Sequence, residues 1–199
     1  MVKALEDRRI IVFDESEERG AAITQTLERR GASVVLVGRD PPGRTTAEVA
    51  ARFAEATARI GAITDLVVAQ AAPPWTGRSP LRFEAAFQDD GFWRESIAAG
   101  VDVPWRWLCA ALQAMGGGTI MILLPMHGPV TDEAPDDAAA REGMIAFMRI
   151  AADQAGMTGI RVNAAQIAAK TAAATVARTI AGLMTASMNG EVVTVQAAR

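Results

Sequence analysis

The order in which apolar runs and helical segments alternate constrains the fold of this chain more than any other feature of its sequence. Six short apolar runs rich in β-branched residues lie at 8–13, 33–38, 65–71, 119–125, 160–167 and 191–196. Between them, helical periodicity predicts helices near residues 16–30, 46–60, 90–115, 137–156 and 170–186. Strands that alternate with helices in this way are typical of a parallel sheet covered on both faces. We therefore predict a three-layer, doubly wound α/β fold with a Rossmann-like parallel sheet.

Composition narrows the organisation and the partners of the chain. Its 199 residues, 50% of them hydrophobic, suit one compact domain over residues 1–199, and no linker divides it. The net charge of −3, with dispersed basic residues, argues against a nucleic-acid surface. The most apolar segment, GTIMILLP at 118–125, is far shorter than the roughly 20 residues of a membrane helix. A single cysteine and a charged N-terminus, MVKALEDRR, lead us to expect a cytoplasmic protein without membrane or nucleic-acid partners.

Four segments resemble the short-chain dehydrogenase/reductase family. They are RRIIVFDESEERGAAITQTLERRGASVVLVGRD at 8–40, TDLVVAQAA at 64–72, GGGTIMILLPMHG at 116–128, and GMIAFMRIAADQAGMTGIRVNAA at 143–165, in which GIRVN is the most specific. The resemblance implies a Rossmann-type sheet and the NAD(P)-dependent interconversion of alcohols and carbonyls. Compared with the family, the chain is shortened between residues 38 and 65, as though the second helix and third strand had been trimmed.

The stretch FDESEERG at 13–20 departs from the family's glycine-rich phosphate loop, TGxxxGxG. Asp14, Glu18 and Gly20 fall on the three glycine positions of that pattern, and only Gly20 is a glycine. The side chains would fill the space where pyrophosphate approaches the backbone, and a carboxylate about 4 Å from a phosphate charge costs roughly 1 to 4 kcal/mol. Asp14 or Ser16 can instead cap the helix, and Glu17 and Glu18 can stabilise its positive end. We therefore expect no dinucleotide cofactor in this chain.

The family's catalytic residues are also missing, since the chain contains no tyrosine for the YxxxK motif. Alignment on GIRVN places Asp137 at the tyrosine position and Arg141 at the lysine position. The family's serine falls on Pro125, which has no side-chain donor, and its helix asparagine falls on Gly100. The acidic run DEAPDD at 132–137 indicates an exposed turn around Asp137. These substitutions predict that the chain by itself is not an enzyme.

What the resemblance leaves intact are the helices through which family members assemble. The segments 90–115 and 137–156 correspond to helices that pair with a neighbouring subunit in a four-helix bundle. Candidate interface residues on them are Trp105, Leu108, Leu112, Met144, Phe147, Met148 and Ala151, and about half of these must instead cover the chain's own sheet. The resemblance thus implies a non-catalytic subunit of a hetero-oligomer, with a heterotetramer as the expected stoichiometry. Its partner would be an active NAD-dependent paralogue that holds the NAD(P) and oxidises an alcohol or hydroxyacyl-CoA.

Two other functions remain open. The chain is either a stand-alone regulatory module with a ligand other than NAD(P) in the altered cleft, or a reductase with unconventional residues such as Asp137 and Arg141. A metal centre is not expected, because His127 is the only histidine and Cys109 the only cysteine.

Overall fold

Within the part of the chain that the structure describes, six parallel strands form one sheet, in the order β2-β1-β3-β4-β5-β6. The structure is a computed structural model that describes residues 4–38, 44–69, 90–126, 135–168 and 170–196, with backbone alone at 90–92, 96 and 135. The strands are β1 (Arg9–Phe13), β2 (Ser33–Val37), β3 (Asp65–Ala69), β4 (Gly118–Met126), β5 (Ile160–Ala168) and β6 (Val192–Val195). All six coincide with the predicted runs, and the doubly wound α/β fold is confirmed.

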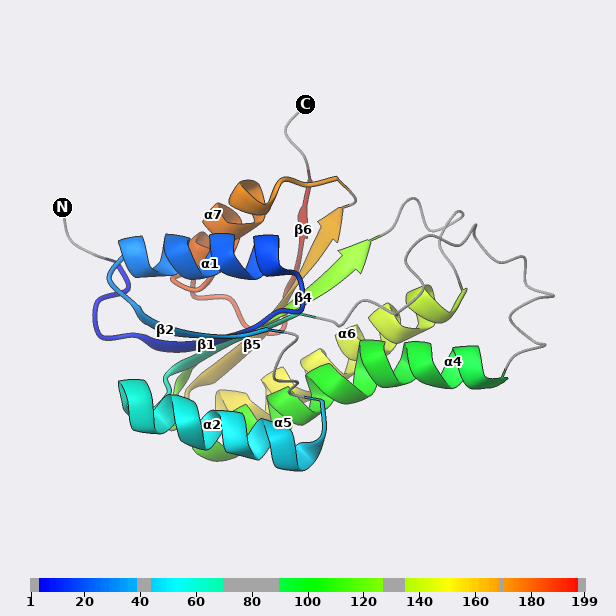
Figure 1. Ribbon diagram of the computed structural model, residues 1–199, viewed down its shortest axis with the longest axis horizontal. Helices are drawn as coiled ribbons and strands as arrows, with labels where there is room; N and C mark the ends of the chain where they lie inside the picture. Colours follow the sequence, from blue (N-terminus) through cyan, green and yellow to red (C-terminus); the bar gives the residue numbers. More distant parts are fainter. Residues whose placement is uncertain (1–3, 39–43, 70–89, 127–134, 169, 197–199) are drawn as a thin grey trace.

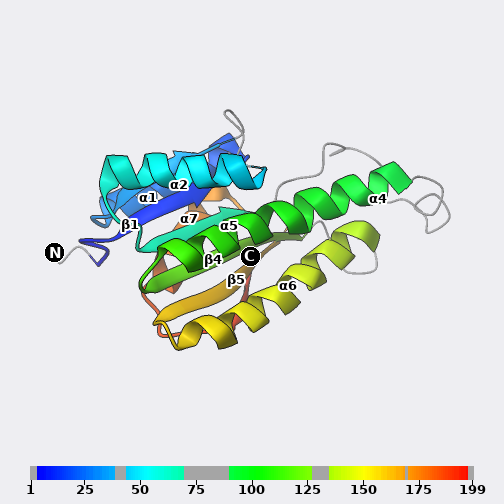
Figure 2. The same cartoon turned by 90° about the horizontal axis from the view of Figure 1, so that it is seen from below.

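Helices cover both faces of the sheet, as Figure 1 shows. On one face lie α1 (Glu17–Arg29) and α7 (Ala173–Leu183), and on the other lie α2 (Thr46–Ile60), α5 (Val103–Ala114) and α6 (Pro135–Gly156). Two further segments, α4 (Asp90–Ile97) and the π-helix η1 (Ala98–Asp102), run directly into α5. Together they form one long helix beside α6, and its α4 end extends beyond the sheet (Figure 2).

The period-two alternation of side chains on the strands produces two separate cores. In β1, Ile11 and Phe13 pack under α2 and α5, whereas Ile10 and Val12 pack under α1 and α7. Since β1, β3 and β4 are covered on both faces, nearly all of their residues are buried, which explains why the sequence shows continuous apolar runs rather than alternation.

The shortened segment between β2 and β3 retains its helix. Residues 46–60 form α2, whose start carries a capping box in which Thr45 and Glu48 each bond the other's backbone N–H. Only four residues separate Ile60 from Asp65, so α2 leads directly into β3. The helix predicted at 46–60 is therefore confirmed and the second helix is not trimmed away, whereas no strand lies between α2 and β3.

The predicted helix at 90–115 is interrupted by a π-helical turn. Val103 donates its backbone N–H to the carbonyl of Ala98, five residues back. Pro104 follows immediately and has no N–H with which to continue an α-helical ladder. The irregular turn thus lies where proline prevents the regular pattern, and it contains Gly100.

Candidate functional site at the carboxyl edge of the sheet

A cavity of about 320 Å³ lies between the carboxyl ends of β4 and β5 and the amino ends of α1 and α7. In doubly wound folds, ligands bind outside the carboxyl ends of the strands near the point where strand order reverses. Here the chain leaves β1 for β2 on one side and returns to β3 on the other. The residues that line the cavity are Ser16, Glu18, Arg19, Pro125, Met126, Ile167, Ala168, Lys170, Thr171, Ala172, Ala173 and Val176.

Asp14, the first residue after β1, is buried and anchors the turn into α1. Its carboxylate accepts hydrogen bonds from the backbone N–H of Ser16 (2.9 Å) and from Nε and Nη2 of Arg19 (2.6 and 2.8 Å). Ser16 is the residue that caps α1, because its hydroxyl accepts the backbone N–H of Arg19. The sequence allowed either Asp14 or Ser16 as the residue that caps α1, and the structure shows that Ser16 does so.

Two of the four acidic residues in this turn are paired with arginines. Glu15 forms a bidentate pair with Arg44, with nitrogen–oxygen distances of 2.6 and 2.7 Å, and this hydrogen bonding raises the pKa of Arg44 above its ordinary value. Asp14 is paired with Arg19, while Glu17 and Glu18 occupy the first turn of α1. The repulsion expected from the sequence is therefore reduced, since partner arginines neutralise two of the four carboxylates.

Gly20 lies where α1 packs closely on β2. A Cβ atom at this position would lie 3.0 Å from Cδ1 of Leu36 and 3.3 Å from Cβ of Asp14. The glycine that the turn shares with the phosphate-loop pattern thus also fits close helix–strand contact.

The four positions that correspond to the family's catalytic residues are not gathered around the cavity. Pro125 lines it, near the end of β4, and Gly100 is buried in η1. Asp137 and Arg141 lie one turn apart on α6 and are not among the lining residues. Arg141 is only 3% exposed, and its guanidinium contacts the Glu142 carboxylate at 3.1 Å.

The acidic run before α6 is more ordered than the sequence indicated. Residues 135–137 form the first turn of α6, with Asp136 buried and Asp137 partly buried. An exposed turn at Asp137 is therefore a wrong prediction; residues 132–134, like His127, lie outside the described part of the chain. The run had the composition of a loop, but two aspartates are also favourable at a helix amino end.

The candidate interface residues divide into two groups. Leu108, Met144, Met148 and Ala151 are buried in the chain's own core, so they cannot contact another subunit directly. Leu112 is half-buried against that core. Trp105 and Phe147 are each 38% exposed, and their ring centroids lie 4.9 Å apart, joining α5 to α6 on the outer surface. Periodicity along these two helices could not distinguish the inner from the outer side of so broad an apolar surface.

A second cavity, of about 300 Å³, lies between the start of α2 and the η1–α5 segment. It is lined by Arg44, Thr45, Glu95, Ala98, Ala99, Asp102, Val103 and Arg106. Arg106 donates to the carbonyl of Arg44 (2.8 Å) and approaches Asp102 (3.5 Å). Among the described lining residues, two arginines and two acids balance in charge, so this part of the lining favours neither an anionic nor a cationic ligand.

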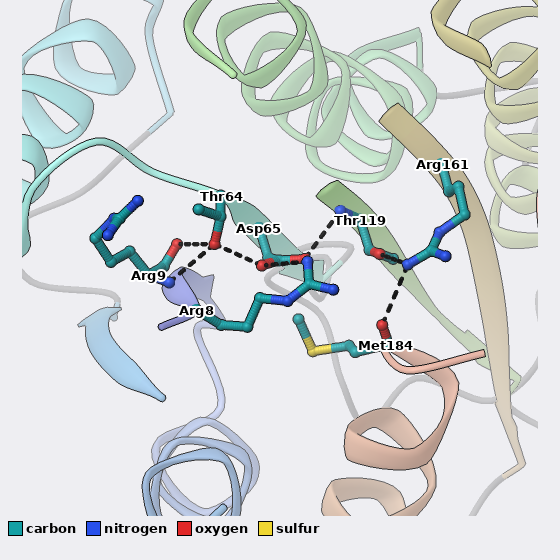
Figure 3. A network of polar contacts seen from close by, with 7 residues as sticks. All are labelled: Arg8, Arg9, Thr64, Asp65, Thr119, Arg161 and Met184. Carbon is teal, nitrogen blue, oxygen red and sulfur yellow. Dashed lines mark hydrogen bonds and ion pairs between the residues drawn. The ribbon is translucent and has the colours of Figure 1, made fainter. Parts of the chain in front are cut away.

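Sequence reasoning also missed a buried polar network at the opposite edge of the sheet, shown in Figure 3. The Asp65 carboxylate accepts Nη1 of Arg8 (3.0 Å), the Thr64 hydroxyl (2.7 Å) and the backbone N–H of Thr119 (2.9 Å). Arg161 extends the network by donating to the Thr119 hydroxyl (2.8 Å). Because it joins the amino ends of β1, β3, β4 and β5, away from the cavity, we interpret it as a structural clamp. The unusual acid at the start of the apolar run at 65–71 was the available signal.

Solved structures with a similar fold identify the architecture. A short chain dehydrogenase from Mycobacterium smegmatis aligns with a TM-score of 0.81 and 21% identity, over 98% of this chain and 95% of that chain. The Bacillus cereus enoyl-acyl carrier protein reductase with NADP⁺ and indole naphthyridinone gives 0.82 and 17%, over 97% and 96%. A 3-ketoacyl-(acyl-carrier-protein) reductase from Brucella melitensis complexed with NADH gives 0.81 and 15%, over 96% and 97%. The fold is that of the short-chain dehydrogenases.

These comparisons correct one expectation. The prediction that the chain is not an enzyme is contradicted, because the similar structures include a dehydrogenase and two reductases, and it is not retained. At identities of 15–21% the similarity establishes the fold and no substrate. No protein-family model matches the sequence, and no curated protein does.

Neither a metal-ligating cluster nor a membrane-spanning helix occurs among the described residues. No group of three or more His, Cys, Asp or Glu side chains there is arranged to hold a metal ion. Among the helices of the same residues, none is both long and apolar enough to cross a bilayer.

Proposed function

We propose that this chain is a cytoplasmic subunit of an oligomeric, NAD(P)-dependent oxidoreductase of the short-chain dehydrogenase type. It would bind a dehydrogenase paralogue through the outer surface of α5 and α6, in a hetero-oligomer that we expect to be a heterotetramer. The observation that carries the proposal is the exposed aromatic pair of Trp105 and Phe147 on these two helices.

The exposed surface around this pair has the character of a helix-docking face. Ile150, one turn after Phe147 on α6, is 54% exposed. Ala146, a small exposed residue next to Phe147 on the same helix, allows another helix to approach closely. Aromatic side chains are enriched at the centres of protein interfaces, where they bury a large apolar area. An isolated chain would leave this surface in water, so a helical partner surface is favoured.

The cofactor and substrate of the assembly follow from the same proposal. We expect NAD(P) to be held by the partner subunit. In this chain the Asp14 carboxylate already accepts a hydrogen bond from the backbone N–H of Ser16 in the β1–α1 turn, so this N–H is not available to a phosphate. For the substrate we propose a hydroxyacyl-CoA thioester. The chain's type and shortness resemble one subunit of the heterotetrameric dehydrogenase that oxidises 2-(hydroxybenzyl)succinyl-CoA in anaerobic toluene degradation.

Affinity capture from the native host tests the assembly. The tagged chain should recover a short-chain dehydrogenase in stoichiometric amount, as measured by mass spectrometry, and the complex should bind NADH or NADPH. Phe147→Glu should abolish capture, because it places a charge at the centre of the interface. Leu36→Glu is the matched control, since Leu36 is similarly exposed (39%) but lies on β2, on the other side of the molecule. Recovery of the chain alone, or capture that Phe147→Glu leaves unchanged, would contradict the proposal.

The cavity at the carboxyl edge supports a second candidate function, a regulatory module that binds a ligand in the altered cleft. Its volume of about 320 Å³ falls at the lower end of the range of small-molecule sites, roughly 300 to 1,000 Å³. A ligand that binds only the folded state should raise the melting temperature of the chain.

A further inference from the structure

The cavity between α1 and α7 carries a set of polar groups that select a particular ligand chemistry. We propose that it binds a small organic monocarboxylate with an apolar body, held by Arg19 and Lys170. The inference rests on the second candidate function and names its ligand class; it is independent of the assembly through α5 and α6.

Arg19 is fixed so that part of its guanidinium remains for a ligand. Its Nε and Nη2 bond the buried Asp14 carboxylate at 2.6 and 2.8 Å, and Asp14 is itself held by the N–H of Ser16. A guanidinium has five N–H donors, so the Nη1 group is left over. The Arg19 side chain is 22% exposed and lines the cavity. Because the Asp14 carboxylate already holds the Arg19 guanidinium in place, binding of a ligand to Arg19 costs little side-chain conformational entropy.

Lys170 supplies the second positive charge at the rim of the cavity. Its backbone is left-handed, with φ of 64°, a conformation that costs a lysine energy and is retained only where the surroundings impose it. Thr171 holds this conformation, because its N–H and hydroxyl both bond the Ala168 carbonyl, at 3.2 and 2.7 Å. The strained turn therefore keeps an exposed lysine beside the cavity.

The remaining lining residues define the size and charge of the ligand. The walls of the cavity are apolar and are formed by Pro125, Met126, Ile167 and Val176. The hydroxyl of Ser16 accepts a hydrogen bond from the backbone N–H of Arg19, so its own proton can be donated to a ligand. The amino end of α7 has no side-chain cap, which leaves backbone N–H groups at Ala172 and Ala173.

Glu18 limits the negative charge that the site accepts. It lines the same cavity, so the charges of Asp14, Glu18, Arg19 and Lys170 sum to zero before a ligand enters. A single carboxylate can contact Arg19 and Lys170, whereas a phosphate or pyrophosphate carries further charges that meet the Glu18 carboxylate. An apolar monocarboxylate thus fits better than a phosphorylated compound.

Calorimetric titration of the full chain with benzoate and hexanoate tests the proposal. Both should bind saturably, and the neutral amides benzamide and hexanamide should bind at least tenfold more weakly. Pyrophosphate should bind more weakly than either carboxylate to the unaltered chain, and Glu18→Gln should tighten its binding. Absence of saturable carboxylate binding, equal affinity for the amides, or tighter binding of pyrophosphate would overturn the proposal.

Substitutions locate the binding and control for folding. Lys170→Gln, at an exposed residue, should weaken benzoate three- to tenfold. Arg19→Gln alone would leave the buried Asp14 carboxylate without its charged partner, so the double variant Asp14→Asn/Arg19→Gln is used. This variant should bind benzoate at least tenfold more weakly, and its thermal unfolding, followed by circular dichroism, should remain cooperative. Arg178→Gln, on the exposed side of α7, is the matched control. A loss of affinity in the control equal to that of Lys170→Gln would place the binding elsewhere. Because affinity capture reports on assembly and titration on this cavity, the two proposals fail separately.

Discussion

Individual charged side chains in the β1–α1 turn show how a local sequence pattern can mislead. Four acids within FDESEERG indicate a strongly negative loop. The structure pairs Asp14 with Arg19 from the following helix turn and Glu15 with Arg44 from 29 residues away. The first partner was visible in the sequence at a spacing of five residues, whereas the second depends on the packing of α2 beside β1.

Both carboxylate oxygens of Asp65 accept hydrogen bonds in the buried network. We expect Asp65→Asn to lower the free energy of unfolding by about 1–3 kcal/mol at pH 7, because asparagine offers one acceptor oxygen where the carboxylate offers two. Chemical denaturation measures this. Asp153→Asn, an exposed carboxylate on α6, should change stability by less than about 0.5 kcal/mol. Equal effects in the two variants would remove the structural role assigned to the network.

The same residue predicts a pH dependence. Desolvation raises the pKa of Asp65 above its ordinary value, against the opposing effects of Thr64, Arg8 and the N–H of Thr119. Between the unfolded and the folded pKa the native state binds more protons, so this contribution to stability is complete below the unfolded pKa and is lost as pH rises through the folded one. The stability difference between the unaltered chain and Asp65→Asn should therefore grow as pH falls from 7 towards 4. A difference that shrinks on acidification would show that the pKa is lowered instead.

Gly118 at the start of β4 is expected to tolerate no side chain. Its φ is 120°, and a Cβ there would lie 1.8 Å from the carbonyl oxygen of Thr64. We predict that Gly118→Ala lowers the free energy of unfolding by more than about 3 kcal/mol. Gly182→Ala is the opposite case, because this helical glycine has open space around it and should gain about 0.5–1 kcal/mol. Thermal and denaturant unfolding compare the pair, and a similar response in both would contradict the steric argument.

Helix α5 illustrates how an element contributes to both the core and the surface. Trp107 is fully buried and stacks on Phe13 of β1 at 4.9 Å, with Phe53 of α2 at 5.5 Å. Trp105, two residues earlier, faces outward against Phe147. Two residues correspond to about 200° around a helix, so the two tryptophans serve opposite sides.

The two tryptophans should therefore differ in their effect on stability. Trp107→Ala is expected to cost about 3–5 kcal/mol, because it leaves a large cavity between β1, α2 and α5. Trp105→Ala should cost less than about 1.5 kcal/mol, since its side chain is already 38% exposed. Denaturant unfolding of the isolated variants measures both. If Trp105→Ala were the more damaging, α5 would have to face the sheet with its opposite side.

For the molecule as a whole, the long α4–η1–α5 helix and α6 lie side by side (Figure 2). Trp105, Phe147 and Ile150 on these helices are exposed outside the two cores. We predict that Phe147→Glu combined with Ile150→Glu raises the solubility of the isolated chain without lowering its unfolding free energy by more than about 1 kcal/mol, because neither side chain belongs to the buried core. Light scattering against concentration is the measurement, and Leu36→Glu/Met157→Glu is the matched pair of exposed apolar residues elsewhere. Equal solubility gains in the two pairs would remove the special status of this surface.

The sequence by itself determined the parallel α/β sandwich, because burial on both faces demands continuous apolar runs and the crossovers between parallel strands demand helices. It also marked α5 and α6 as broadly apolar. The tertiary structure alone decided which side of each helix faces the sheet, which arginine neutralises Glu15, and that Arg19 and Lys170 share a cavity. These features join residues far apart in the chain or on separate elements, and periodicity along one segment contains no information about its neighbours in space.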